Sequence, residues 1–162
     1  MKEMDRYHGI LADEEYIKLL GQMEEYEKDR IYCCHGLEHV CDVARIMYIL
    51  ALEEGSGLSQ DVIYATALLH DIGRIKQYES GIPHHEASVD MAGGFLARHG
   101  YEQTEIAMIL DAIHQHRVEG EQLSPLADYL YRADKLSRNC FCCKASDTCK
   151  WPIQQRNQTI EI

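Results

Sequence analysis

The chain has 162 residues, of which 46% are hydrophobic and 27% charged, a balance typical of one soluble globular domain. Its formal net charge of −11, with no cluster of Lys and Arg, argues against a nucleic-acid polymer as partner, because such binding depends on basic side chains that displace counterions. The N-terminal stretch 1–13 is polar and no apolar run approaches the roughly 18 residues of a membrane helix, so we expect neither a signal peptide nor a membrane span.

Apolar residues recur at helical spacing in six segments, and strand-like alternation is scarce. The third segment follows a capping Ser59 and is apolar nearly all round, which is typical of a central, buried helix. Gly73 interrupts the pattern after it, and residues 78–83 are expected to form a loop. The predicted helices span residues 13–30, 36–54, 61–70, 85–99, 102–116 and 125–136. The sequence therefore predicts an all-α protein.

We expect a single domain with three parts. Residues 1–32 supply an N-terminal helix that packs on the bundle, and residues 33–138 form its core. Residues 139–162 form an irregular tail that belongs to the same domain, since periodicity is weak there and four of the seven Cys and the only Trp fall within it. The predicted compartment is the cytoplasm, where these cysteines would be reduced.

The pair His70-Asp71 ends the most hydrophobic of the predicted helices. Burying these two polar groups is costly unless hydrogen-bond partners or a metal compensate. Adjacent side chains on a helix diverge by about 100°, yet at a helix end a long His and a short Asp can reach one ion. A C-terminal His followed by an Asp that caps the next turn explains the dipeptide equally well.

Other histidines change this balance. His35 and His39 are four positions apart at the start of a predicted helix and so share one face. An antiparallel bundle can bring several helix ends together, and further polar residues of the same kinds stand at such ends or on the last helix. These residues are His84, His85, His114, His116 and Asp134.

The order of these residues resembles the signature of HD-domain phosphohydrolases. HGLEHVCDVARI resembles the first metal-binding helix of that family, and ATALLHDIGR resembles the helix with the His-Asp pair. HHEASVDMA, DAIHQHR and YRADKLSR resemble its later motifs in the same order. The resemblance covers about residues 33–138 and implies an HD-type helical bundle of about six helices.

The resemblance also implies a metal site. Asp71 would bridge to a second ion held by His84 and His116; if only one ion binds, these two histidines would contact phosphate. His85 could take the place of His84. Mixed imidazole and carboxylate ligands suit Mn, Fe, Co, Ni or Zn, and Mg less well, and such ions acidify bound water. The implied ligands of the first ion are His39, His70, Asp71 and Asp134.

Three residues near these motifs have expected roles in catalysis besides Asp71. In the related cyclic-nucleotide phosphodiesterases a His at the offset of His35 is the general acid, so His35 would donate a proton to the leaving oxygen. A hydrogen bond that supports a ligand is the other interpretation of His35. Arg74 and Lys135 would neutralise substrate phosphate, although ion pairs with carboxylates explain both equally well.

The predicted function is hydrolysis of a phosphate ester or anhydride in a small nucleotide or other phosphorylated metabolite. Every core ligand type is present, which favours this over a non-catalytic, metal-containing nucleotide-binding or sensor module. A di-iron HD-type oxygenase is a third interpretation, because the same ligands serve that chemistry. The expected partner is the small phosphorylated substrate, and a homodimer is compatible with the sequence.

The cysteines depart from a generic HD domain. Their spacing in the tail is C-x2-C-x5-C, and Cys34 directly precedes the His35 motif. One hypothesis is a structural Zn site or iron–sulfur cluster that holds the tail on the bundle. The other interpretation is a set of partly buried free thiols. The proposed ligands are Cys34, Cys140, Cys143 and Cys149.

Overall fold

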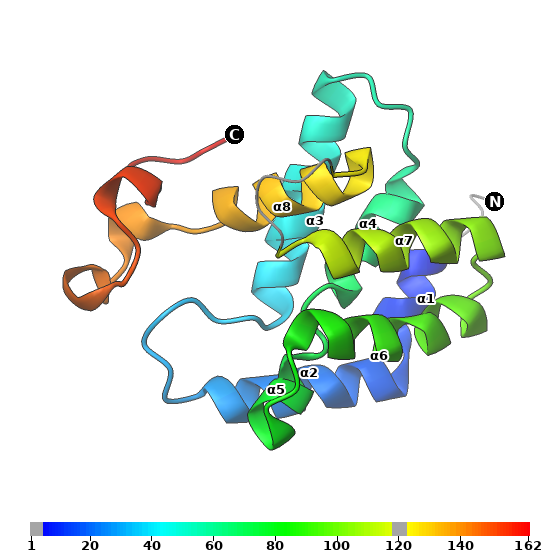
Figure 1. Cartoon of the computed structure of the whole chain (residues 1–162), viewed down its shortest axis with the longest axis horizontal. Helices are drawn as coiled ribbons and strands as arrows, with labels where there is room; N and C mark the ends of the chain where they lie inside the picture. The colour runs from blue at the N-terminus through cyan, green and yellow to red at the C-terminus, as the bar shows by residue number, and fades with distance from the viewer. Residues whose placement is uncertain (1–4, 118–122) are drawn as a thin grey trace.

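The structure is a computed structural model that describes residues 5–117 and 123–162. Within these ranges it contains eight α-helices, three short 3-10 helices and no strand, so the prediction of an all-α fold is confirmed (Figure 1). The α-helices are α1 (Arg6–Ala12), α2 (Glu14–Glu27), α3 (Leu37–Glu53), α4 (Gln60–Leu69), α5 (Arg74–Ser80), α6 (His84–Arg98), α7 (Gln103–Gln115) and α8 (Pro125–Leu136). The 3-10 helices are η1 (Cys140–Cys142), η2 (Ser146–Thr148) and η3 (Ile153–Gln155).

Six of the α-helices coincide with the six predicted segments, and α1 and α5 are additional. Each of these two helices has seven residues and buries a single side chain, Ile10 in α1 and Ile75 in α5. One buried residue creates no periodic pattern, which is why neither helix is visible in the sequence. The loop expected at 78–83 is correspondingly shorter, because α5 continues to Ser80 and ends at Gly81, whose φ is +75°.

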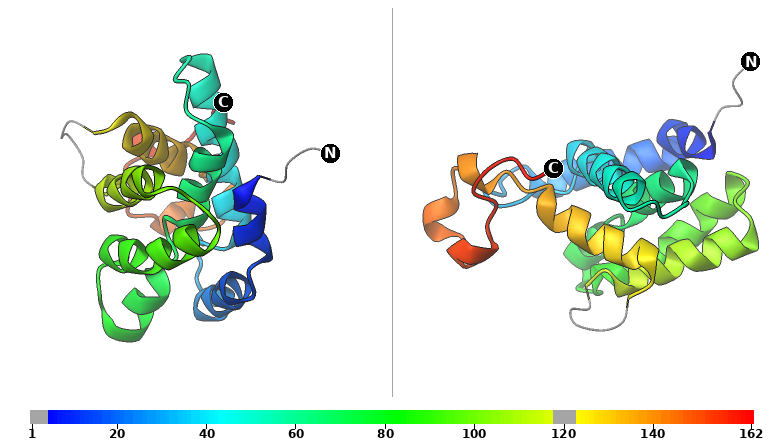
Figure 2. Two further views of the ribbon diagram at one scale, coloured as in Figure 1. Left: turned by 90° about the vertical axis from the view of Figure 1, so that its right-hand side faces the viewer. Right: turned by 90° about the horizontal axis from the view of Figure 1, so that it is seen from above.

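Helix α4 is the centre of the fold, as its apolar sequence predicts. It packs against α3, α7 and α1, while α8 packs on α3 and α7, and α6 packs on α7 and α5 (Figures 1 and 2). The hydroxyl of Tyr16 on α2 donates a hydrogen bond to the carbonyl oxygen of Leu68 at 2.7 Å, which ties α2 to the end of α4. The C-terminal end of α4 is thereby fixed in the interior of the bundle.

Residues 139–162, here called the C-terminal segment, lie beside the bundle and not inside it (Figures 1 and 2). All of them are described, and Ala145 is the only buried residue among them. This segment therefore follows the expectation of an irregular tail with three short 3-10 turns. None of the helices in the described ranges has the length and apolar character needed to cross a membrane.

Gly73 links the end of α4 to α6 at very close range. Its N–H donates a hydrogen bond to Ser88 Oγ at 2.8 Å. A Cβ at this position would lie 2.2 Å from the backbone nitrogen of Ser88 and 2.4 Å from the backbone oxygen of His84. Because both atoms belong to the backbone, no side-chain rotation can relieve such a clash.

We predict that Gly73→Ala lowers the free energy of unfolding by about 3 kcal/mol or more, because α6 has to move away from α4. Gly94→Ala on the exposed side of α6 is the matched control, since a Cβ there meets nothing within 4 Å. That control is expected to raise stability by about 0.5–1 kcal/mol through helix propensity. Urea denaturation followed by circular dichroism measures both, and wild-type stability of Gly73→Ala would contradict the close approach described here.

Candidate metal centre

Four of the predicted ligands meet at one point in the bundle. His39 lies in the first turn of α3, His70 is the C-cap of α4, Asp71 follows it, and Asp134 lies in the last turn of α8. His39 Nε2 is 3.1 Å from Asp134 Oδ1 and 3.3 Å from Asp71 Oδ2. His70 Nε2 is 3.1 Å from Asp71 Oδ2 and 3.6 Å from Asp134 Oδ1. In the described residues these four side chains form a group whose ligand atoms all lie within 4.8 Å.

A second group shares Asp71 with the first. Asp71 Oδ1 is 3.5 Å from His84 Nε2 on α6 and 3.9 Å from His116 Nε2 at the end of α7. Asp71 therefore presents Oδ2 to the first group and Oδ1 to the second, which is the arrangement of a bridging carboxylate. His85 does not belong to either group; its ring packs instead near the ring of His114, with the centroids 5.8 Å apart.

The buried polar atoms at this point lack hydrogen-bond partners in the described part of the chain. They include both carboxylate oxygens of Asp71 and the Nε2 atoms of His39, His70 and His84. These atoms are close to one another, yet their geometry forms no hydrogen bond. An unpartnered buried polar group costs about 1–3 kcal/mol, and a cation that accepts several lone pairs at once removes that cost. The residues therefore fit a metal ion.

The opposite ring nitrogens show which tautomer faces the centre. His70 Nδ1 lies 2.6 Å from the carbonyl oxygen of Ala67, and His116 Nδ1 lies 2.5 Å from that of Ile113. Since a carbonyl oxygen only accepts, each Nδ1 carries a proton, so Nε2 is the nitrogen that can offer a lone pair to an ion beside Asp71. For His70, an ion bound there would displace the proton from Nε2. His84 Nδ1 is 3.1 Å from Gln77 Oε1, which is compatible with the same tautomer.

The pKa values of the histidines differ between the two groups. Although burial acts against it, the carboxylates of Asp71 and Asp134 raise the pKa of His70 to about 10. Burial lowers the pKa of His84 to about 3 with help from Arg74, and lowers that of His116 to about 4 with help from His70. His84 and His116 are thus neutral at pH 7, as metal ligands must be. The carboxylates attract positive charge, which a divalent ion would supply.

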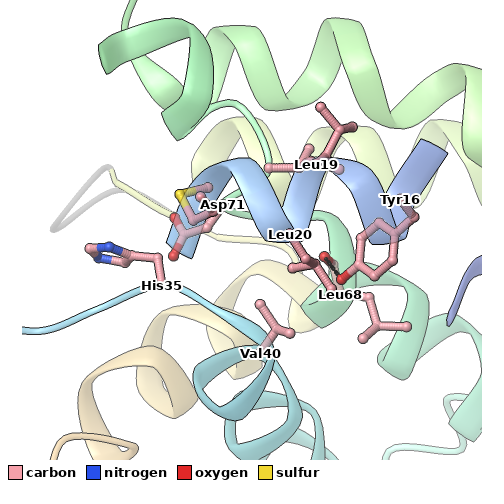
Figure 3. Close-up of a pocket in the computed structure, with 9 residues that line it drawn as sticks. Tyr16, Leu19, Leu20, His35, Val40, Leu68 and Asp71 are labelled. Atoms are coloured by element: carbon pink, nitrogen blue, oxygen red, sulfur yellow. Dashed lines mark hydrogen bonds between the residues drawn. The ribbon is translucent and has the colours of Figure 1, made fainter. Parts of the chain in front are cut away.

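Exposure shows where a substrate can reach the centre. The side chains of His70, Asp71, His84 and His116 are at most 4% exposed, whereas those of His39 and Asp134 are 15% and 32% exposed. A small cavity between α2, α3 and α4 also touches Asp71 and His35, but it is otherwise apolar (Figure 3). It is about large enough for one water molecule. Access therefore runs along the side of Asp134.

His35 is held by a buried carboxylate that the sequence analysis did not identify. Glu27 accepts a hydrogen bond from the backbone N–H of His35 at 2.7 Å, and its Oε2 lies 2.5 Å from His35 Nδ1. The hydroxyl of Tyr78 donates to the same oxygen at 2.6 Å. Burial opposes ionisation of Glu27, but these bonds lower its pKa to about 2. The His35 ring stands edge-on to that of His39, with centroids 5.5 Å apart.

The two predicted phosphate-binding cations have partners within the chain. Arg74 Nε is 3.2 Å from Asp71 Oδ1, so this guanidinium already balances a ligand carboxylate. Lys135 places its ammonium 4.0 Å from the centre of the Tyr131 ring. The cysteines at 34, 140, 143 and 149 do not form a group with ligand atoms within 4.8 Å, although the structure describes all of them.

The family model of the HD domain matches residues 36–139, so this chain belongs to the HD domain family. An uncharacterised protein of Clostridium beijerinckii is 44% identical over 157 residues, which cover 97% of this chain and 99% of that protein. Ribonuclease Y of Syntrophomonas wolfei is 33% identical over 146 residues, which cover 80% of this chain but 26% of that enzyme. The resemblance inferred from the motifs is confirmed at the level of the family.

A crystal structure supports the fold independently. A protein described as a predicted HD superfamily hydrolase from an uncultured Thermotogales bacterium superposes with a TM-score of 0.62. The superposition covers 86% of this chain and 80% of that one, and the sequences are 24% identical. The two proteins share the HD-type helical fold.

We predict that Asp134→Ala lowers the affinity for Mn²⁺ at least about 100-fold, beyond the range for residues that only support a ligand. Asp128→Ala is the matched control on the same helix, because Asp128 pairs with Arg132 at 2.9 Å and not with a histidine. Isothermal titration of metal-free protein measures both affinities. Equal Mn²⁺ binding by the two variants would show that Asp134 is not a ligand.

Proposed function

We propose that this chain is a metal-dependent phosphohydrolase that uses water to cleave a phosphate ester or anhydride in a small nucleotide or other phosphorylated metabolite. The observation that carries the proposal is the bridging position of Asp71, whose two oxygens face two separate ligand groups. One or two divalent ions, when bound there, would acidify water and stabilise negative charge on a phosphoryl oxygen. The donor set suits Mn, Fe, Co, Ni or Zn better than Mg.

His35 is the proposed proton donor to the leaving oxygen. Its Nδ1 is engaged by Glu27, so Nε2 is the ring atom that can exchange a proton with substrate. Burial lowers the pKa of His35, and the carboxylate of Glu27 opposes this by favouring the doubly protonated ring. Glu27 also fixes the position of His35 by accepting its backbone N–H. Asp71 joins the two ligand groups, because one of its oxygens faces each group. Arg74 balances the negative charge of Asp71.

The charge of the chain supports a small substrate. Ribonuclease Y is named for action on RNA, and its similarity to this chain supports phosphodiester or phosphoanhydride cleavage as the reaction class. This chain spans about a quarter of that enzyme's length, however, and carries a net charge of −11. A compact phosphate group needs neutralisation only at the centre itself, for which Lys135, next to Asp134, is a proposed contributor.

The assay that tests this proposal combines purified protein and each of the six metals with nucleotides, dinucleoside polyphosphates, simple phosphate esters and RNA oligonucleotides. We expect phosphate or nucleotide release from a small substrate with a transition metal. His70→Ala combined with Asp71→Ala should reduce the rate at least about 1,000-fold, equivalent to about 4 kcal/mol. His84→Ala should also reduce it strongly, while His85→Ala serves as the matched control and should stay near wild type.

Other outcomes of the same panel decide against the proposal. Hydrolysis that survives the double substitution would place the reaction elsewhere. Tight nucleotide binding without turnover would identify a sensor module, and oxygen consumption in the di-iron form would identify an oxygenase. Preference for RNA oligonucleotides over every small substrate would contradict the assignment of substrate class.

A separate prediction concerns His35 and Glu27. His35→Gln is expected to lower kcat by about 100-fold or more through loss of the proton donor. Glu27→Gln keeps the shape of the side chain but removes its negative charge, so kcat should fall less than in His35→Gln. Because protonated His35 loses its anionic partner, its pKa should fall and the pH optimum of kcat should shift to lower pH. Mn²⁺ affinity should stay unchanged in both variants. An unchanged kcat in His35→Gln would show that His35 is not the proton donor and that its role is structural.

A further inference from the structure

We propose that Cys33, Cys140, Cys143 and Cys149 form a four-thiolate site for Zn²⁺ that fastens the C-terminal segment to the loop preceding α3. This site is separate from the His and Asp groups and does not depend on the proposed function. It differs from the sequence hypothesis in one ligand, because Cys33 takes the place of Cys34.

The C-terminal segment has no apolar core of its own. Ala145 is its only buried residue, and three isoleucines and Phe141 are exposed. Hydrogen bonds from side chains to backbone carbonyls organise it instead. Arg156 donates to the carbonyl oxygens of Trp151, Ser146 and Cys149 at 2.7, 2.9 and 3.1 Å. Such bonds contribute about 1 kcal/mol each, and small units without a core usually rely on a disulfide or a metal.

Two short 3-10 turns arrange the cysteines of the tail. η1 ends at Cys142 and η2 ends at Thr148, so Cys143 and Cys149 each follow a 3-10 turn with extended backbone angles. Within the first turn the N–H of Cys143 donates to the carbonyl oxygen of Cys140 at 3.2 Å. Cys140, Cys143 and Cys149 are half-buried, whereas Cys142 is exposed and its thiol donates to the carbonyl oxygen of Asn139. Three of the four tail cysteines are therefore partly buried, and the fourth, Cys142, is exposed.

The fourth thiol comes from the loop before α3. The hydroxyl of Tyr32 lies 3.1 Å from the carbonyl oxygen of Thr148 and 3.0 Å from its Oγ1, which joins the neighbours of Cys33 and Cys149. In Figures 1 and 2 the loop before α3 and the C-terminal segment lie on the same side of the bundle. Arg30 Nε also donates to the carbonyl oxygen of Cys33 at 2.7 Å and fixes the loop at this residue.

Cys33 and Cys34 have different surroundings. Cys33 is an exposed residue, like Cys34, but its sulfur lies among groups of the tail. Partial burial raises the pKa of this thiol, Arg138 lowers it, and Cys140 and Cys143 raise it further. Mutual repulsion of neighbouring thiolates is what a bound cation reverses. The thiol of Cys34 instead donates to the carbonyl oxygen of Tyr32, and the charged groups that act on it are Glu27 and Arg30. The groups that act on the Cys33 thiol thus include residues of the tail, whereas those that act on Cys34 belong to α2 and the loop, so we assign the fourth ligand to Cys33.

The backbone brings the four cysteines to one side of the bundle, but their sulfurs do not meet at one point. No three of these four described sulfurs lie within 4.8 Å of one another. Tetrahedral Zn with bonds of about 2.3 Å separates its sulfurs by about 3.8 Å, so the thiol side chains have to rotate inward when the ion binds. Zn²⁺ suits this role because it imposes no redox chemistry and structural sites of this kind are closed by four protein ligands.

The experiment uses the full chain produced with zinc in the medium and measured by elemental analysis. The His70→Ala, Asp71→Ala double variant, which lacks one ligand of the first group and the ligand that both groups share, should retain about one Zn per chain. Adding Cys140→Ser and Cys143→Ser should lower this to less than about one tenth. Cys33→Ser should lose Zn in the same way, while the matched controls Cys34→Ser and Cys142→Ser should keep it.

A second measurement avoids reliance on the folding of the multiple variant. Co²⁺ added to the metal-free wild-type chain should give the thiolate-to-cobalt charge-transfer band, and Cys33→Ser should weaken it. Absence of both the band and residual Zn would overturn the proposal. Loss of Zn in Cys34→Ser but not in Cys33→Ser would overturn the choice of ligand, and iron with visible absorption would overturn the choice of metal. Hydrolytic activity is not a readout, so this proposal and the proposed function fail independently.

Discussion

The structure depends on one electrostatic constraint, the burial of Asp71 with both of its oxygens lacking hydrogen-bond donors among the described residues. An ionised carboxylate in that position is stable only beside positive charge. Arg74 supplies part of it from the next helix, and four imidazoles surround the rest. Helices α3, α4, α6, α7 and α8 each bring a residue within reach of this carboxylate or its partners. The bundle is therefore arranged around a place for a cation as much as around its apolar core.

The same local device positions two of those imidazoles. His70 and His116 are each the C-cap of a helix, and each Nδ1 bonds to the carbonyl oxygen three residues earlier. A helix end leaves such carbonyls without backbone partners, so the bond satisfies the helix and fixes the tautomer together. The two rings then present Nε2 toward Asp71 and lie with centroids 5.4 Å apart. Helix termination and ligand orientation thus have one cause.

What could be predicted from the sequence follows this logic. The ligand set His39, His70, Asp71 and Asp134 is implied by the order of the motifs, which resembles the HD family, whereas helical periodicity alone only places these residues in or at the ends of helices. Glu27 carried no signal, because it lies in a run of charged residues that resembles a solvated helix face, and only the tertiary structure buries it against His35 and Tyr78. The sequence hypothesis names Cys34 as a ligand, and the proposed exchange for Cys33 rests on the tertiary neighbours of the two thiols, since adjacent residues in a loop have no periodicity to separate them.

The exposed side of the centre connects it to the C-terminal segment. Asp134 is the most exposed of the ligands, and the chain runs from it through Arg138 into the tail cysteines. The loop before α3 carries Cys33 and His35 and leads to His39 in the first turn of α3. Asn157 fastens the C-terminal segment to the end of α8 by donating to the carbonyl oxygens of Lys135, Leu136 and Arg138 at 2.9, 3.2 and 2.7 Å. The hydroxyl of Tyr32 bonds to Thr148 in the same segment, so the C-terminal segment contacts both the loop that carries His35 and the end of the helix that carries Asp134.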